Sequence, residues 1–336
     1  MRSMKNVVVA VAFGLLVAGL SLAGAQNKAP VGKDFCKNVS ITFFPGGPEG
    51  GPFASTVYRG AKAAQELTGA NVDYVWSNWI PSTMVAQFKN AIARHPDGIA
   101  VMGHPGDAAL DPLITDAENA GIIVTSQNVT LPKAEAKYKA DGFGYVGQEL
   151  YQSGVSLADA AAKMANLQKG DRVMVWGLLS QGTRGQRTAG AVDTLKKMGM
   201  QVDYIEISDA VNSDPSQGTS VIGGYIASHP DVKLIVVDHG ALTATIPTYL
   251  QAAGVKPGQI TMAGFDMTPA TVSGIEDGYI SVVLDQQPWL QGFLPIMQIC
   301  LTKQYGFSGL HIDTGGALIT KQNIKAIAPL VDQGIR

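Results

Sequence analysis

The stretch from Asp171 to Gly190, DRVMVWGLLSQGTRGQRTAG, indicates the fold class. Val173 to Trp176 is a run of β-branched and large apolar residues, typical of a strand buried on both faces. Glycine and serine then interrupt the run, and apolar residues return at helical spacing from Thr183 onward. The pattern predicts that Arg184 lies at the start of a helix, just beyond the carboxyl end of a buried strand. Ligands bind at that edge in open α/β sheets, although an arginine there can also cap its own loop or pair on the surface.

Alternating strand and helix patterns continue from this stretch in both directions. Further strands are predicted at residues 39–44, 71–76, 98–102, 122–125, 145–147, 202–207, 234–237, 260–263 and 280–284. Helices are predicted at residues 53–67, 84–94, 108–120, 148–164, 217–228, 242–253, 269–277, 289–304 and 321–330. A less regular segment, residues 128–141, comes between two similar halves. The sequence therefore predicts an α/β fold of two Rossmann-like lobes with parallel sheets, whose strand ends face one gap.

The N-terminal segment, residues 1–25, is typical of a secretory signal peptide. Arg2 and Lys5 precede an apolar core, and the small residues Ala23-Gly24-Ala25 form a cleavage site. An uncleaved anchor is the alternative, because the apolar stretch up to Ala25 carries no charge. Ala25 also stands where a lipid-modified cysteine would be. We therefore expect a mature protein that is soluble, exported and without a lipid anchor.

The composition excludes some partners. The chain has 336 residues, of which 46% are hydrophobic and 15% are charged, and its net charge is −2. Loss of Arg2 and Lys5 with the signal peptide changes this by −2, to −4. Such a charge argues against a nucleic-acid partner, which favours a basic surface. The length suggests two domains.

The familiar cofactor and metal motifs are missing from the sequence. The glycine-rich loop at residues 46–51 follows the first strand, but it lacks the G-x-G-x-x-G order and contains Glu49, which would repel phosphate. The histidines and cysteines show no metal-binding spacing, so we expect neither cofactor nor metal. Cys36 and Cys300 fit one bridge in an oxidising compartment, or two buried free thiols.

Polar and aromatic side chains follow the predicted strands. The candidate ligand-binding residues are Phe53, Trp79, His104, Asn128, Arg184, His239, Asp266 and Gln286. Aromatic faces cover the C–H patches of a polyhydroxylated ligand, while amide, carboxylate and guanidinium groups bond its hydroxyls. The set therefore indicates a small carbohydrate.

Several of these residues have a purely structural alternative. Trp79 can pack against helices of the first lobe, and His104 can shape the turn before its proline. His239 can be a buried, hydrogen-bonded histidine, and Asp266 can cap the helix predicted near Pro269. The dipeptide Asp238-His239 is an acid–histidine pair at a strand end, but no G-x-S-x-G nucleophile motif accompanies it.

With these residues in hand, the chain resembles the type I periplasmic solute-binding proteins of ABC transporters, and among them the ribose, galactose and xylose binders. The matching segments are TRGQRTAGAVDTL (183–195), AGFDMTPATVSGI (263–275), VVLDQQPWLQG (282–292) and ARHPDGIAVM (93–102). The resemblance implies that Phe53 stacks on a sugar, that Arg184 and Asp266 bond its hydroxyls, and that Gln286 supplies an amide near the hinge.

This sequence departs from the family pattern at three places. His239 falls where the family commonly has Asn. Asn128 and Val129 fall where ribose binders have Asp-Arg, which argues against a close copy of the ribose site. Ser213 falls where an aromatic residue usually closes the second lobe, so Trp79 is expected to supply the missing ring.

The resemblance also implies an organisation and a role. Residues 26–146 with 287–313 would form the N-terminal lobe and residues 147–286 with 314–336 the C-terminal lobe, joined by a three-segment hinge. The helix at 289–304 would return to the first lobe, which makes a Cys36–Cys300 bridge possible. The expected role is a monomeric receptor that binds a monosaccharide or sugar alcohol and delivers it to an ABC permease, without catalysis. A chemoreceptor or quorum-signal binder of the same fold, and an exported sugar-modifying enzyme, are the alternatives.

Overall fold

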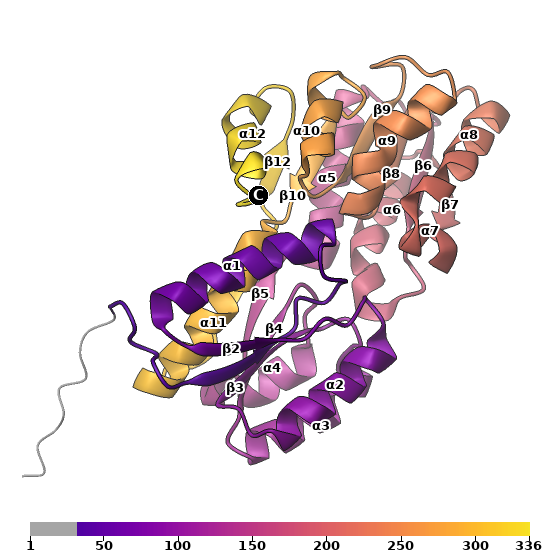
Figure 1. Cartoon of the computed structure of the whole chain (residues 1–336). Helices are drawn as coiled ribbons and strands as arrows, with labels where there is room; N and C mark the ends of the chain where they lie inside the picture. The colour runs from indigo at the N-terminus through magenta and orange to yellow at the C-terminus, as the bar shows by residue number, and fades with distance from the viewer. Residues whose placement is uncertain (1–31) are drawn as a thin grey trace, which may run out of the picture.

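The computed structural model describes residues 32–336, which form two α/β lobes, each built on one six-stranded sheet (Figure 1). The strand order is β11-β5-β4-β3-β1-β2 in the first sheet and β12-β10-β9-β8-β6-β7 in the second. The signal peptide expected at residues 1–25 lies outside the described residues. The two sheets confirm the predicted two-lobed α/β fold.

The strands of both sheets are short and largely buried. The first sheet contains β1 (Ser40–Phe43), β2 (Asn71–Tyr74), β3 (Gly98–Met102), β4 (Ile123–Gln127), β5 (Gly144–Gly147) and β11 (His311–Asp313). The second contains β6 (Arg172–Gly177), β7 (Gln201–Glu206), β8 (Leu234–Val237), β9 (Thr261–Phe265), β10 (Val282–Asp285) and β12 (Ala317–Ile319). The central strands β3 and β8 are buried along their whole length, as their continuous apolar sequences predict. β4 is equally buried, although it ends in the polar residues Thr125, Ser126 and Gln127.

The sequence predicted that all strands are parallel, and β12 is an exception. β12 pairs antiparallel with β10, with Ala317 opposite Asp285, whereas every other pairing in the two sheets is parallel. The chain enters the second sheet beside the carboxyl end of β10 and is already at the edge where the parallel strands end. It can therefore pair with β10 only by running back along it.

Helices cover both faces of each sheet. The larger ones are α1 (Pro52–Thr68), α2 (Pro81–Ala93), α3 (Asp107–Asn119), α5 (Leu150–Met164), α6 (Gln186–Lys197), α8 (Gly218–Ser228), α9 (Gly240–Ala252), α10 (Pro269–Glu276), α11 (Pro288–Tyr305) and α12 (Ile324–Asp332). The shorter ones are α4 (Pro132–Tyr138), α7 (Asp209–Ser213) and the 3₁₀ turns at Lys139–Asp141, Gly182–Gly185 and Pro215–Gln217. α1 packs on α11 at one face of the first sheet, and α5 packs on α6 at one face of the second.

Reciprocal glycines hold both of these helix pairs close together. A Cβ atom on Gly60 of α1 would lie 1.9 Å from the Trp289 carbonyl oxygen, and one on Gly292 of α11 would lie 1.8 Å from the Val57 oxygen. The pair α5 and α6 repeats the arrangement, since Gly154 and Gly190 each meet a backbone carbonyl of the other helix at about 2 Å. The two lobes therefore share one way of packing helices as well as one strand order, and their sheets differ in the direction of the edge strands β11 and β12.

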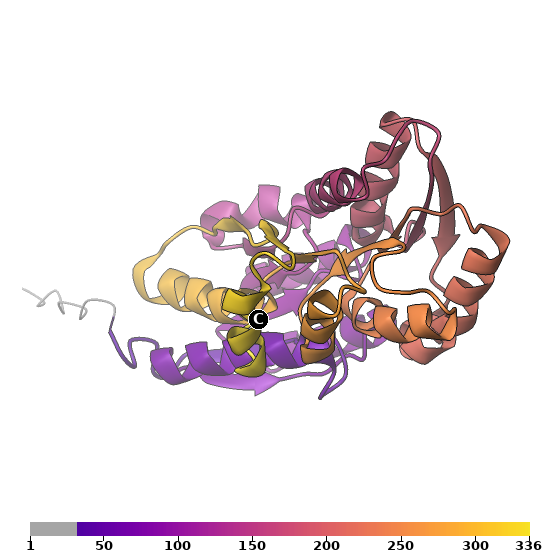
Figure 2. The same cartoon turned by 90° about the horizontal axis from the view of Figure 1, so that it is seen from above.

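The chain passes between the sheets three times. It leaves the first sheet after β5, returns after β10, and leaves again after β11. As a result α11, which follows a strand of the second sheet, lies beside α1 (Figures 1 and 2). The lobe boundaries expected from the sequence stay a prediction.

A disulfide joins the start of the described chain to α11. Cys36 and Cys300 are bonded, with a Cα–Cα distance of 5.6 Å, and both are fully buried in the core of the first lobe. The expected bridge is confirmed, and the alternative of two free thiols is wrong. The link closes a loop of 264 residues that contains the whole second sheet except β12.

Three local expectations were wrong. The helix expected from Thr183 begins at Gln186, and Arg184 lies in the 3₁₀ turn before it. Ser126 and Gln127, expected beyond the end of a strand, are the last residues of β4. The segment expected to be irregular, residues 128–141, contains α4, which begins at a proline in the first helical position.

Among the described residues, no helix is both long and apolar enough to cross a membrane.

Candidate ligand-binding site

The eight candidate residues all follow strands, at the carboxyl ends of the two sheets. Phe53, Trp79, His104 and Asn128 come after β1, β2, β3 and β4 of the first sheet. Arg184, His239, Asp266 and Gln286 come after β6, β8, β9 and β10 of the second. The carboxyl ends of parallel strands meet at one edge of a sheet, so each lobe presents its four residues together.

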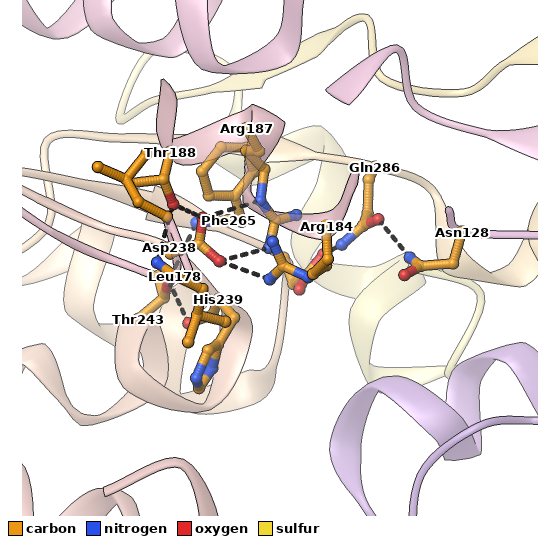
Figure 3. A network of polar contacts seen from close by, with 12 residues as sticks. Asn128, Leu178, Arg184, Arg187, Thr188, Asp238, His239, Thr243, Phe265 and Gln286 are labelled. Atoms are coloured by element: carbon orange, nitrogen blue, oxygen red, sulfur yellow. Dashed lines mark hydrogen bonds and ion pairs between the residues drawn. The ribbon is translucent and has the colours of Figure 1, made fainter. Parts of the chain in front are cut away.

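A buried carboxylate organises the second lobe's half of the site. Asp238 accepts hydrogen bonds from Arg184 Nη2 at 2.5 Å, from Arg187 Nη2 at 3.2 Å and Nε at 3.3 Å, and from Thr188 Oγ1 at 2.8 Å (Figure 3). Asp238 is only 3% exposed, and both arginines are buried. Arg187 also lies over the Phe265 ring, at 4.0 Å from its centroid. The carboxylate therefore fixes both guanidinium groups.

Asp266 is linked across the hinge to the first lobe. Gln286 Nε2 donates to Asp266 Oδ1 at 2.7 Å. Asn128 Nδ2 donates to Gln286 Oε1 at 2.9 Å (Figure 3). Gln148 and Gln291 donate to the same Gln286 oxygen, at 3.2 and 3.3 Å. Gln286 thus joins a carboxylate of the second lobe to amides on the segments that connect the lobes.

The first lobe's half of the site is aromatic. Trp79 lies between Phe53 and His104, with ring centroids 5.8 and 5.0 Å away. Its indole ring packs on the backbone of the first glycine-rich loop, because a Cβ atom at Gly46 or Gly47 would lie 2.7 Å from it. The loop that resembled a phosphate-binding loop therefore serves to make room for Trp79. All three rings are half-buried.

Three of the eight candidate side chains keep a buried polar atom without a hydrogen-bond partner in residues 32–336. These atoms are His104 Nδ1 in the first lobe and Arg184 Nη1 and His239 Nε2 in the second. Such orphaned groups are costly unless a ligand or water satisfies them. Their presence in both lobes indicates that the site is built to hold a molecule with its own donors and acceptors.

The charges of the site lower the pKa of both histidines. Burial, together with the positive charges of Arg184 and Arg187, lowers the pKa of His104 to about 3. The pKa of His239 falls to about 4 for the same reasons, although Asp238 opposes the change. Both imidazoles are therefore neutral at physiological pH, so each offers one donor and one acceptor. The hydrogen bond from Asn128 to Gln286 brings the two halves of the site together.

The two carboxylates of the site respond differently to burial. Burial opposes the ionisation of Asp238, but Arg184 and Arg187 outweigh it and hold the pKa of this carboxyl well below its ordinary value. For Asp266 burial prevails and raises the pKa to about 6, although Arg187 and the hydrogen bond from Gln286 oppose the rise. Asp266 is thus the carboxylate of the site that titrates near neutral pH.

Three of the candidate residues have left-handed backbone conformations. Trp79, Asn128 and Asp266 have φ angles of 59°, 65° and 69°. Residues other than glycine adopt such angles rarely, although asparagine and aspartate do so more readily than most. Asn128 and Asp266 directly follow β4 and β9, so these turns end the strands at the edge of each sheet where the candidate residues lie.

Two of the structural alternatives are wrong. The cap of α10 is Thr268, whose hydroxyl accepts from the Thr271 N–H, so Asp266 is not that cap. The Asp238-His239 dipeptide does not form an acid–base pair, since the carboxylate binds the two arginines and Thr188.

Arg187, Gln148 and Gln291 belong to the network but were not among the residues predicted from the sequence. Arg187 follows Arg184 by three residues, so helical spacing could have placed both on one face. Gln148 and Gln291 lie beside hinge segments, and only the three-dimensional arrangement brings them to Gln286.

Two surface hollows lie away from the candidate residues. One of about 370 Å³ is lined by Glu118, Ile123 and Asp141, and one of about 450 Å³ by Ser40 and Asn71. Both are at the amino ends of strands in the first sheet, opposite to the candidate residues. Among the described residues, no group of histidine, cysteine and acidic side chains could hold a metal ion.

Comparison with known proteins gives consistent matches along most of the chain. The profile of the periplasmic binding protein domain matches residues 41–302. The xylose/arabinose-binding protein of Sulfolobus acidocaldarius is 32% identical over 290 residues, which are 82% of this chain and 69% of that protein. The D-ribose/D-allose-binding protein of Pseudomonas aeruginosa is 26% identical over 241 residues, which are 70% of this chain and 73% of that protein.

Solved structures match as well. An ABC transporter solute-binding protein from Burkholderia graminis, in complex with D-arabinose, superposes with a TM-score of 0.75 and 26% identity. The match covers 87% of this chain and 98% of that one.

Proposed function

Because this chain belongs to the periplasmic binding protein domain family, we propose that it is the exported solute-binding component of an ABC importer for a monosaccharide or sugar alcohol. The ligand would be held between the two lobes by the eight candidate residues, and the closed complex would deliver it to a membrane permease. The signal peptide at residues 1–25 would be cleaved on export to the periplasm. Binding would involve no chemical conversion.

One observation carries the proposal. His104 Nδ1, Arg184 Nη1 and His239 Nε2 are buried polar atoms with no hydrogen-bond partner in residues 32–336, and they belong to strand ends of both sheets. A molecule with many hydroxyl groups can satisfy each of them, because every hydroxyl both donates and accepts. Trp79 and Phe53 supply apolar faces beside these atoms, as the C–H patches of a sugar ring require.

The names of the relatives support this ligand class. The matching proteins are named for xylose, arabinose, ribose and allose, and a matching structure contains D-arabinose. The amide Asn128 and the neutral imidazole of His239 suit uncharged hydroxyl groups in the same way.

A panel of pentoses, hexoses and polyols tests the proposal. A ligand that binds the folded protein raises its melting temperature by mass action, and calorimetry then gives the affinity and stoichiometry. We expect at least one neutral member of the panel to bind with one site per chain and to be recovered unchanged. Absence of binding across the panel would contradict the ligand class, and recovery of an altered sugar would contradict the role as a receptor without catalysis.

The role in transport needs a separate test. In cells that depend on this protein, deletion of its gene should abolish uptake of the radiolabelled ligand at low concentration, and the intact gene should restore it. Normal uptake by the deletion strain, together with a chemotactic defect toward the same ligand, would favour a chemoreceptor.

A further inference from the structure

The charged groups of the candidate site form a compensated set. Arg184 and Arg187 are both paired with Asp238, and Asp266 lies close enough to both to interact with their charges. The neighbouring Asp285 has a cation of its own, since its Oδ2 accepts from Arg336 at 3.0 Å. Two positive and two negative charges therefore remain in the site, and their sum is zero when Asp266 is ionised.

This compensation has a consequence for the ligand. A carboxylate that enters a buried site loses its hydration and needs an uncompensated cation to replace it. Asp238 occupies Arg184 Nη2 and two donors of Arg187, and it leaves Arg184 Nη1 as a buried donor without a partner among the described residues. A hydroxyl oxygen can accept from Nη1 while Asp238 stays in place, whereas a ligand carboxylate would have to share both guanidinium groups with a carboxylate that already binds them.

We propose that Asp238 is a specificity-determining residue that restricts the site to uncharged sugars and polyols and excludes sugar acids, because it neutralises Arg184 and Arg187. The proposal rests on the proposed function, since it concerns the choice among carbohydrates at the same site. Asp238 acts through the two arginines, so its effect lies in the ratio of affinities for acidic and neutral ligands.

The test compares matched ligands on wild-type protein and on Asp238→Asn. D-glucuronate and D-glucose, and D-galacturonate and D-galactose, differ by a carboxylate in place of a hydroxymethyl group. Calorimetry on the wild type should show binding of a neutral sugar and strong discrimination against its acid. Asp238→Asn leaves a net positive charge, and the acid-to-neutral ratio of association constants should rise by about tenfold or more.

Acetate and acetamide are smaller probes that serve if the binding site is too small for hexoses. Sodium acetate should compete with whichever neutral sugar binds to Asp238→Asn, while acetamide at the same concentration and ionic strength should not. Neither compound should affect binding of that sugar to the wild type, because its arginines are already compensated.

A double variant provides the matched control. Asp238→Asn combined with Arg187→Gln removes one charge of each sign and restores a net charge of zero. Its acid-to-neutral ratio and its insensitivity to acetate should return to those of the wild type. A merely structural role for Asp238 would instead give the double variant the larger defect.

The wild type offers a measurement that needs no variant, should Asp238→Asn fail to fold. Protonation of Asp266 at about pH 5 also gives the site a net positive charge, while D-glucuronate and acetate stay ionised. His104 and His239 stay neutral there, since their pKa values are about 3 and 4. The acid-to-neutral ratio or the sensitivity to acetate should then rise between about pH 7.5 and pH 5.

The outcomes separate the two proposals. Failure of the wild type to bind any neutral sugar or polyol overturns the proposed function. The role of Asp238 is overturned if the wild type binds a neutral sugar but Asp238→Asn shows the same acid-to-neutral ratio and the same acetate sensitivity. If that variant is unfolded, the role is overturned when neither quantity changes in the wild type between about pH 7.5 and pH 5. A wild type that binds the acid as tightly as the matched neutral sugar overturns it directly.

Discussion

The two halves of the candidate site use different chemistry. The first lobe contributes rings, Phe53, Trp79 and His104, which are half-buried and carry no charge at neutral pH. The second lobe contributes ions, above all Arg184, Asp238 and Asp266, of which none is more than 7% exposed. Aromatic contacts are broad and tolerate small displacements, whereas hydrogen bonds between buried ions fix atoms in place. Under the proposed function, the first lobe would supply contact area and the second would supply selection among hydroxyl groups.

The two halves also differ in the expected cost of a substitution. Removal of an aromatic ring reduces the apolar contact with a ligand, but it leaves no buried polar group without a hydrogen-bond partner. Removal of one member of the ion network leaves buried donors or acceptors unsatisfied, which costs more. Substitutions in the second lobe should therefore have the larger effects on binding.

Replacement of Arg184 should have the largest effect. In Arg184→Met the ligand loses the guanidinium donor, and Asp238 keeps Arg187 as its partner, so the fold should survive. Calorimetry with the ligand identified in the sugar panel should show affinity reduced by about 100-fold or more, since a site built to bond a hydroxyl discriminates strongly when a partner is lost.

Arg172 provides the control at the other end of the same strand. It lies at the start of β6, where it pairs with Asp203 and Asp231 at the surface. Arg172→Met removes an arginine from the same lobe and should leave affinity within about twofold of the wild type, since exposed pairs contribute little. Equal losses in the two variants would mean that Arg184 acts through stability alone.

The disulfide should affect the free energy of unfolding but not the ligand affinity. Cys36 and Cys300 join the N-terminal part of the first lobe to α11, whereas the second lobe has no such link within residues 32–336. Replacement of both cysteines by serine should reduce the free energy of unfolding by about 2 to 4 kcal/mol, because the unfolded chain regains the freedom that the closed loop restricts. Calorimetric unfolding should show the loss, and ligand affinity measured below the transition should not change.

Trp79 tests the aromatic half. In Trp79→Ala the ring between Phe53 and His104 is lost, and we expect affinity to fall by about tenfold, in line with the worth of one aromatic contact. Trp76→Ala is the matched control, since Trp76 packs on Tyr58, outside the candidate set, and it should leave affinity unchanged once the folded fraction is taken into account. A loss at Trp79 as large as that at Arg184 would remove the proposed contrast between the halves.

The sequence predicted the fold more completely than the site. Strands such as β3 and β8 are continuous apolar runs, and their positions follow from local pattern. The direction of β12 does not, because it depends on where the chain enters the second sheet. The resemblance to a known family supplied the pairing of Cys36 with Cys300.

The sequence could predict only those candidate residues whose place follows from their position after a predicted strand. Residues that follow strands were found by that rule, Arg184 and Asp266 among them. The role of Asp238 could not be found in this way, because its partners Arg187 and Thr188 come from α6 and meet it only after the lobe has folded. Gly46 and Gly47 leave room for the Trp79 ring, and this contact also forms only in the folded lobe. The local sequence instead resembled a phosphate-binding loop.

The smallest expected effect is a dependence of binding on pH that comes from the second lobe. The pKa of Asp266 is about 6, and the ionised carboxylate accepts hydroxyl hydrogen bonds that the protonated form accepts less well. Between about pH 7.5 and pH 5 the affinity for a neutral sugar should fall by about threefold to tenfold, in step with the fraction of ionised Asp266. Asp266→Asn should bind weakly and lose this dependence, as calorimetry at a series of pH values would show.

Protein stability should change in the opposite direction over the same range. Because the pKa of Asp266 is raised in the folded state, its contribution to stability is complete below its unfolded value of 3.8 and is lost as the pH rises through about 6. Asp238 has a depressed pKa, so its contribution is present above about pH 4 and disappears only on stronger acidification. On going from pH 7.5 to pH 5, binding should therefore weaken while Asp266 makes the fold more stable, and weaker binding accompanied by unfolding would contradict this assignment. A pH dependence that persists in Asp266→Asn and disappears in His104→Gln would instead place the titrating group in the aromatic half.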